Sequence, residues 1–235
     1  METRQVQDIQ YQLLPGAARR TTDIVIERNG QITVRPPLKM TPQQVDETVF
    51  SRRMWIYRNL AQWRELNAAR VVREWVNGES FLYLGSSYRL LLVEQQDTAL
   101  QLKDGRFQLL RSVVEKGGRT AAQNTFENFL RNKGAPRIAQ RVDLYAPKVG
   151  VRANQIEVKE LGFRWANCLP NGNLQFHWKC LMAPLTVIDY IVVHELCHLR
   201  HRDHSATFWN EVDKVLPHYR ERQEWLRQRG ANLDL

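Results

Sequence analysis

The chain has 235 residues, of which 43% are hydrophobic and 25% are charged, so it can bury a sizeable core and is not an intrinsically disordered chain. Its 34 basic and 25 acidic residues give a formal net charge of +9, which favours anionic partners but also fits an ordinary solvated surface. The three cysteines lack paired spacing, which argues against a disulfide framework and for a reducing compartment.

The N-terminal residues are polar and lack the apolar stretch of a signal peptide. The longest nearly apolar run, Leu181 to Val193, contains Pro184 and Asp189 and is shorter than the roughly 20 residues that a membrane-spanning helix needs. We therefore expect a cytoplasmic protein without a membrane segment.

The first part of the chain changes from a β pattern to a helical pattern and back. Residues 22–35 contain two alternating runs on either side of Asn29-Gly30, which predicts a hairpin. Thr41 and Pro42 predict the start of a helix that continues to about residue 67. Four short strands are then expected at residues 81–84, 88–93, 99–102 and 107–110.

The middle of the chain is expected to be mostly helical. One helix is predicted from about residue 119 to Gly134, and a second is predicted to begin at Pro136. Two strands should follow, at residues 154–166 and 173–181.

The last part of the chain contains three further predicted helices. Pro184 begins a long apolar helix that reaches about Leu199, Ser205 is placed to cap the next helix, and a charged helix ends near Arg229. The order of elements predicts an α+β fold, with a β-rich N-terminal half and then a small sheet packed against an apolar helix and C-terminal helices. We expect two domains, residues 1–112 and 113–235.

A cluster of histidines carries the clearest chemical signal. His194-Glu195-Leu196-Cys197-His198 is an H-E-x-x-H motif on the apolar helix. Residues four apart lie on one face of a helix, so the two imidazoles can bind one zinc ion. Glu195, beside them, is placed to act as the general base that takes a proton from water. If the helix is buried, its two histidines and its glutamate need polar partners, and a metal ion would be one.

The H-E-x-x-H motif supplies two zinc ligands, and the third has to be chosen among the residues that follow it. His201 and His204 both follow the motif, but on a continuing helix His201 would lie about 10 Å beyond His194. A chain that leaves the helix near residue 201 can bring His204 back to the metal, so we favour His204. The H-E-x-x-H-x-x-G-x-x-H spacing is matched except that His201 stands at the glycine position. Glu211 is the carboxylate alternative.

Residues 193–209, VHELCHLRHRDHSATFW, resemble the YgjP-like metallopeptidase domain family, which is related to SprT-like and minigluzincin proteases. Residues 164–168, RWANC, are similar to that family's R-W-G-S-C motif, with Ala166 and Asn167 in place of Gly and Ser. Residues 189–193, 216–220 and 19–63 also resemble family segments, so the resemblance covers nearly the whole chain. It implies a zincin-like fold, a peptidase-like site and zinc bound by the histidines matching His194, His198 and His204.

Arg164, Tyr219 and Arg220 are further candidates for contacts with substrate or the transition state. The leading hypothesis is a zinc-dependent metallopeptidase acting on a peptide or protein substrate. One alternative is a metal-dependent nucleotide phosphohydrolase, since the basic charge would attract nucleotides. Another is a nucleic-acid-associated protein with a structural zinc, although structural sites are usually closed by four ligands. Oligomeric state is left open by the sequence.

Overall fold

The computed structural model describes residues 2–17, 21–26, 30–68, 73–162 and 164–235. Contacts divide the chain into two compact units, Met1–Arg70 and Val71–Leu235. The domain boundary expected at residue 112 lies inside the second unit, and as a division between independently folding domains it stays a prediction. Within the described residues, none of the helices is both long and apolar enough to cross a membrane.

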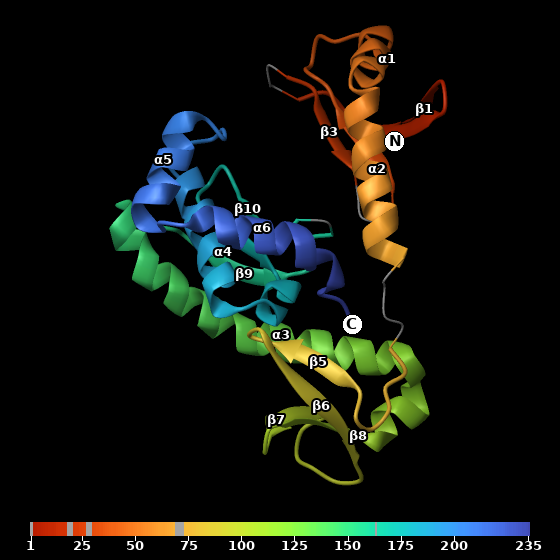
Figure 1. The fold of residues 1–235 in the computed structure, drawn as a ribbon, viewed down its shortest axis with the longest axis vertical. Coiled ribbons are helices and arrows are strands. Elements are labelled where there is room, and N and C mark those ends of the chain that lie inside the picture. Colours follow the sequence, from red (N-terminus) through yellow and green to blue (C-terminus); the bar gives the residue numbers. More distant parts are fainter. Residues whose placement is uncertain (1, 18–20, 27–29, 69–72, 163) are drawn as a thin grey trace. The chain divides into compact units, whose positions relative to one another are not determined.

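The first unit is a four-stranded sheet with two helices (Figure 1). Its elements are β1 (Glu2–Val6), β2 (Ile9–Leu13), β3 (Asp23–Ile26), β4 (Ile32–Arg35), α1 (Pro42–Ser51) and α2 (Arg53–Ala68), and the strand order is β1-β2-β4-β3. The predicted hairpin is present, since β3 and β4 pair antiparallel from Asp23–Arg35 to Ile26–Ile32. Of its predicted turn, Asn29 lies outside the described residues, and Gly30 has a φ of +86°.

Two features of this unit differ from the sequence prediction. Strands β1 and β2 were not predicted, although Ile9 and Tyr11 alternate with polar residues and are buried in β2. The single helix expected to residue 67 is two helices that meet at Arg52. The helix start is as predicted, because Thr41 and Gln44 form a capping box around Pro42.

The second unit begins with another four-stranded sheet, as predicted. Its strands are β5 (Ser80–Tyr83), β6 (Ser86–Val93), β7 (Leu100–Lys103) and β8 (Arg106–Leu110), in the order β5-β6-β8-β7. The tip between β5 and β6 contacts the segment that precedes the histidine-bearing helix: Leu84 N donates to Leu181 O at 2.7 Å. Gly85 is required there, because a Cβ on it would stand 2.8 Å from the Cα of Pro184.

A single long helical run, α3 (Arg111–Val149), replaces the two helices expected around Pro136. Gly118 interrupts it with a φ of 60° and a ψ of −156°, but Pro136 lies inside the helix. Leu130, Gly134 and Ile138 form part of one buried stripe across the proline. The free energy gained by burying this stripe exceeds the cost of the one backbone hydrogen bond that the exposed Pro136 removes from the helix.

The remaining elements surround the histidine motif. They are the strands β9 (Ile156–Lys159), β10 (Ala166–Cys168) and β11 (Leu174–His177), the 3-10 helix η1 (Trp178–Met182), the helices α4 (Leu185–His198), α5 (Ala206–Val215) and α6 (Tyr219–Arg229), and the short η2 (Gly230–Asn232). The strands form a sheet in the order β10-β11-β9, with β9 parallel and β10 antiparallel to β11. The strand predicted at 154–166 is β9 alone, with the unpredicted β10 beginning at its last residue, and the strand predicted at 173–181 ends at His177, where η1 follows. The α+β fold is confirmed.

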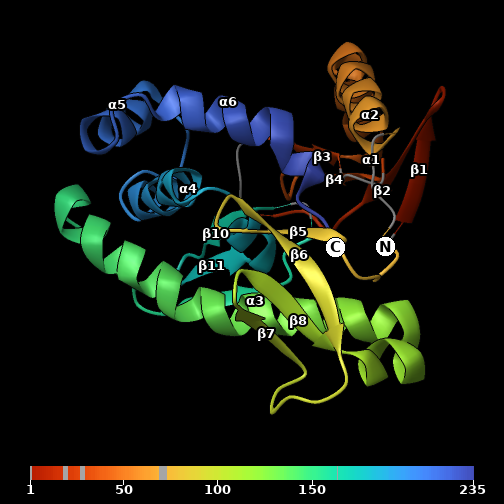
Figure 2. The ribbon, with the colours of Figure 1, turned by 60° about the horizontal axis from the view of Figure 1, so that its bottom comes forward.

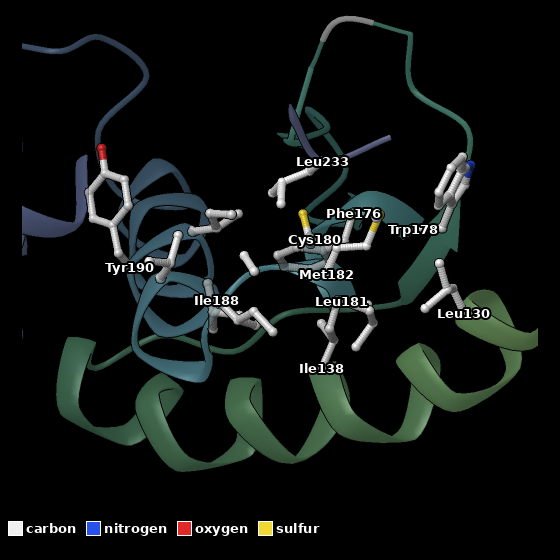
Figure 3. Packing of buried hydrophobic residues seen from close by; sticks show 14 of the residues in the cluster. Leu130, Ile138, Phe176, Trp178, Cys180, Leu181, Met182, Ile188, Tyr190 and Leu233 are labelled. Atoms are coloured by element: carbon white, nitrogen blue, oxygen red, sulfur yellow. The ribbon is translucent and has the colours of Figure 1, made fainter. Parts of the chain in front are cut away.

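Helix α4 lies in the core of this unit and packs against α3 (Figures 1 and 2). Figure 3 shows Ile138 of α3, Leu181 of η1 and Ile188 of α4 gathered in one apolar cluster. Gly134 lets η1, which directly precedes α4, approach α3, since a Cβ on Gly134 would meet Leu181 Cδ2 at 2.7 Å. This packing fixes the position of the helix that carries the H-E-x-x-H motif.

One partly buried ion pair crosses from α3 to α4. Asp189 is only 7% exposed and accepts from Arg141 Nε at 2.6 Å and Nη2 at 2.8 Å. The Tyr145 hydroxyl donates to the same carboxylate at 3.1 Å. Because all three groups lose water on folding, each depends on the others for its polar partners.

We expect Asp189→Asn to lower the free energy of unfolding by about 1–3 kcal/mol, because it leaves the partly buried Arg141 guanidinium without its counter-ion. Urea denaturation followed by circular dichroism measures this. Glu224→Gln is the matched control: it breaks an exposed ion pair with Arg227 and should leave stability nearly unchanged. If both substitutions lowered the free energy of unfolding by the same amount, the pair between α3 and α4 would not stabilise the fold more than an exposed pair does.

Candidate metal centre

The three histidines favoured from the sequence lie together. His194 and His198 are one turn apart on α4, and His204 lies in the loop between α4 and α5. The Nε2 atoms are 3.1 Å apart for His194 and His198, 3.2 Å for His198 and His204, and 3.1 Å for His204 and His194. In the described part of the chain, these three side chains form a group whose ligand atoms fit around one ion.

This spacing suits a zinc ion. Two nitrogens at about 2.0–2.1 Å from a tetrahedral ion stand about 3.3–3.4 Å apart. The observed separations of 3.1–3.2 Å are about 0.1–0.3 Å shorter than that. Neutral imidazole nitrogens are also the donor type that zinc prefers, so the residues present fit the ion.

The chain reaches His204 by leaving the helix directly after the motif. Leu199 is the C-cap of α4, and His201 N still donates to Cys197 O at 2.9 Å. His201 is not among the residues with positive φ, so the turn does not need the left-handed backbone that glycine provides in the related spacing. Ser205 is the N-cap of α5, as predicted, but its hydroxyl bonds to Thr207 Oγ1 rather than capping the helix.

Two arginines tie this loop to its surroundings. Arg200 Nη1 donates to Val149 O at the end of α3 and contacts Glu211 Oε1 at 3.3 Å. Arg202 Nη2 donates to Pro170 O at 3.2 Å, in the turn after β10. The first half of the loop is therefore held against α3, α5 and the turn after β10.

The tautomer of His198 follows from one contact. Its Nδ1 lies 2.9 Å from the carbonyl oxygen of His201. A carbonyl only accepts, so Nδ1 carries the proton and Nε2 offers a lone pair to the cluster. Burial, with the nearby His198 and His204, lowers the pKa of His194 to about 3, and burial also lowers the pKa of His204. The rings are therefore neutral at pH 7, which is the state that binds a metal.

Glu195 lies beside the cluster and is 6% exposed. Burial raises the pKa of its carboxyl to about 8, against the opposing effects of the Arg164 charge and of the Cys168 backbone N–H, which donates to it. Arg164 therefore lies near enough to Glu195 to act on it electrostatically. A strongly perturbed carboxyl beside a cluster of possible metal ligands is a candidate for proton transfer.

Strand β10 is an edge strand beside this carboxylate. His177 N donates to Trp165 O, and Leu169 N donates to Asn173 O. Residues 165 and 169, which flank β10, therefore face β11 and its turn. In an antiparallel pair these bonds alternate along the strand, so Ala166 and Cys168 turn their backbone groups to the other edge. The Cys168 N–H that reaches Glu195 belongs to that outer edge.

Comparison with known proteins supports the family suggested by the motifs. The model of the YgjP-like metallopeptidase domain matches residues 20–229. The chain belongs to the YgjP-like metallopeptidase domain family. Its members are metallopeptidases by description, which implies a divalent metal and a peptide or protein substrate.

No protein with a curated function matches the chain. Among solved structures, the metallopeptidase zymogen of Pyrococcus abyssi abylysin is similar, with 22% identity and a TM-score of 0.37. That match covers 39% of this chain and 93% of the abylysin chain.

Aromatic rings surround the histidines of this YgjP-like chain. Phe208, fully buried, stacks on His198 with ring centroids 4.5 Å apart. Trp209 stacks on His204 at 5.6 Å and also lies 5.7 Å from His194. These rings exclude water from one side of the cluster and restrict the imidazole that the loop supplies.

The other residues predicted for the site lie at different distances from it. Tyr219 is buried and stacks on Trp209 at 5.3 Å, so one ring separates it from the histidines. Arg220 is exposed, with its guanidinium over the Tyr219 ring. His201 and Glu211 lie outside the three-histidine group, and Glu211 contacts Arg200 and Lys214 instead.

Two features of the site were missed by reasoning from the sequence. The backbone N–H of Cys168 has no side-chain signal, because it depends on the register of β10 against β11. Glu160 was also missed: it accepts from Trp178 Nε1 at 2.8 Å and lies 2.9 Å from Nε2 of the buried His177. An acidic residue shortly before Arg164 was the available signal.

We expect His204→Ala to weaken zinc affinity more than the roughly 10–100-fold that loss of an outer-shell partner costs, because it removes one of three converging nitrogens. His201→Ala should have little effect, since it retains the backbone carbonyl that binds His198 Nδ1. Competition with a chromophoric chelator measures both affinities. A larger loss for His201→Ala would contradict the assignment.

Proposed function

We propose that this chain is a zinc-dependent peptidase in which His194, His198 and His204 hold the metal and Glu195 is the general base. The observation that carries the proposal is the convergence of three imidazole Nε2 atoms, 3.1–3.2 Å apart, next to a buried carboxyl. Membership of a metallopeptidase family supports the same reaction class. Three protein ligands leave one position of a tetrahedral ion open, as in catalytic rather than structural zinc sites.

Each residue has a defined task in this proposal. A zinc ion in such a site supplies Lewis acidity, which lowers the pKa of water and polarises a carbonyl oxygen. The Glu195 carboxylate accepts a proton from the attacking water and transfers it to the leaving amine nitrogen. The Arg164 charge and the Cys168 N–H favour the ionised carboxylate that this role requires.

Strand β10 supports a peptide rather than a nucleotide as substrate. Its outer edge turns the backbone groups of Ala166 and Cys168 toward the Glu195 side. An extended peptide can pair with such an edge through main-chain hydrogen bonds, which brings its own carbonyls past the site. A nucleotide has no comparable use for a strand edge. A mixed panel of unfolded protein, short peptides and nucleoside triphosphates tests this preference, and turnover of the triphosphates alone would reject it.

The purified protein should carry about one zinc ion per chain, as a three-histidine site implies. Elemental analysis of His194→Ala/His198→Ala should show the zinc lost. His177→Ala is a suitable comparison, because this histidine is buried against Glu160, outside the three-histidine group. Full zinc retention in the double variant would place the metal elsewhere.

Glu195→Gln should retain the zinc and reduce turnover by about 10²–10⁴-fold, because an amide keeps the size of the side chain but cannot accept a proton from water. Zinc content and peptide turnover are measured on the same sample. The Cys168 N–H can still donate to the amide oxygen, so the fold around the site should be unchanged. Normal turnover with zinc bound would show that Glu195 is not the base.

A further inference from the structure

Strand β7 has an unpaired edge far along the chain from the histidine motif. It is the last strand of its sheet and pairs only with β8 among the described residues. Leu110 N donates to Ala99 O, which sets the alternation of hydrogen bonds along this pair. Leu100 and Leu102 therefore direct their backbone N–H and C=O groups away from β8, where Leu100 O accepts a long hydrogen bond of 3.4 Å from Thr98 Oγ1.

A groove runs along that edge, between β7 and the middle of α3. Its volume is about 890 Å³, which lies within the range of about 300–1,000 Å³ typical of ligand sites. Leu100 and Leu102 line one wall, and Phe129 and Tyr83 contribute aromatic surface. Amide side chains complete the lining, from Gln101, Asn128 and Asn132. An unpaired strand edge next to a helix is the geometry in which an extended peptide adds to a sheet.

The charges of the groove have one sign. Lys133 and Arg137 line it one helical turn apart and are exposed, and none of its lining residues is acidic. Within the part of the chain that the structure describes, neither cation has a carboxylate within ion-pair distance. A partner that supplies carboxylates would therefore find two unpaired cations beside the strand edge.

We propose that the groove between β7 and α3 binds an extended acidic peptide segment, which pairs with the edge of β7 and places carboxylates near Lys133 and Arg137. The strand edge distinguishes this partner from a nucleic acid, because only a polypeptide can continue the ladder of backbone hydrogen bonds. The amides of Gln101, Asn128 and Asn132 then lie where peptide carbonyls and N–H groups pass. This site is separate from the three-histidine cluster and does not depend on the proposed peptidase activity.

The test is a titration of the full-length, ¹⁵N- and ²H-labelled protein with a capped octapeptide of alternating Glu and Val, followed by amide chemical shifts. We expect saturable shifts at Leu100, Leu102 and the facing residues of α3. A peptide with alternating Lys and Val should not bind, because it repels Lys133 and Arg137. The acidic peptide with its four central amides N-methylated should not bind either, because it lacks the donors that a strand pairing needs.

Protein variants separate the charge of the groove from the overall charge. Lys133→Ala/Arg137→Ala should weaken the acidic peptide about five- to tenfold. Lys116→Ala/Arg119→Ala removes the same charge from an exposed part of α3 outside the groove and should leave binding unchanged. Absence of shifts in β7 at millimolar peptide would overturn the proposal. So would equal binding of the N-methylated peptide, or binding of an octathymidylate at the same residues with no binding of the acidic peptide.

Discussion

Helix α4 is the element on which the candidate site depends, and its burial is the physical constraint that fixes it. Ten of its residues are buried, including Ile188, Val192 and Val193, so the helix contacts other elements on nearly all sides. The bidentate pair of Arg141 in α3 with Asp189 in α4 restricts the rotation in which α4 packs, and Gly134 of α3 gives room for Leu181 of η1, which directly precedes α4. A helix held in this way presents His194 and His198 in one fixed orientation, and a metal site needs ligands fixed to within a fraction of an ångström.

The third histidine is positioned by a different set of interactions. The loop that carries His204 is anchored by Arg200 and Arg202 and covered by Trp209. The column of rings continues from Trp209 through Tyr219 to Tyr190 of α4, with centroid distances of 5.3 and 6.3 Å. Stacked rings therefore connect the loop to α4, the helix that carries the other two histidines. This packing restricts the position of His204 relative to His194 and His198.

The outer edges of β10 and β7, two of the edge strands of the second unit, have different surroundings. The edge of β10 lies next to the buried carboxyl of Glu195, whereas the edge of β7 lies along a groove with two cations and no carboxylate. A peptide on the first edge would lie beside the three-histidine cluster, and a peptide on the second would lie beside Lys133 and Arg137. Pairing of a peptide with a strand edge thus supports a proposal about catalysis at β10 and a proposal about recognition at β7.

The sequence by itself determined the elements whose signals are local. Asn29-Gly30, Thr41-Pro42 and the alternating residues of 80–110 predicted the hairpin, a helix start and the second sheet, because turns, caps and strand alternation are set within a few residues. The H-E-x-x-H motif predicted that His194 and His198 share a helix face, since that follows from helical periodicity alone. The family resemblance was also readable from the motifs.

Only the tertiary structure decided the features that depend on residues far apart in the chain. Pro136 does not end a helix, because a stripe buried against η1 and α4 stabilises the helical path on both sides of it. The approach of His204 to the other histidines depends on a loop held by α3, α5 and the turn after β10, and the donation from Cys168 N–H to Glu195 depends on the register of two strands. No local pattern encodes such contacts, because their free energy comes from burial and pairing between segments that meet only when the chain is folded.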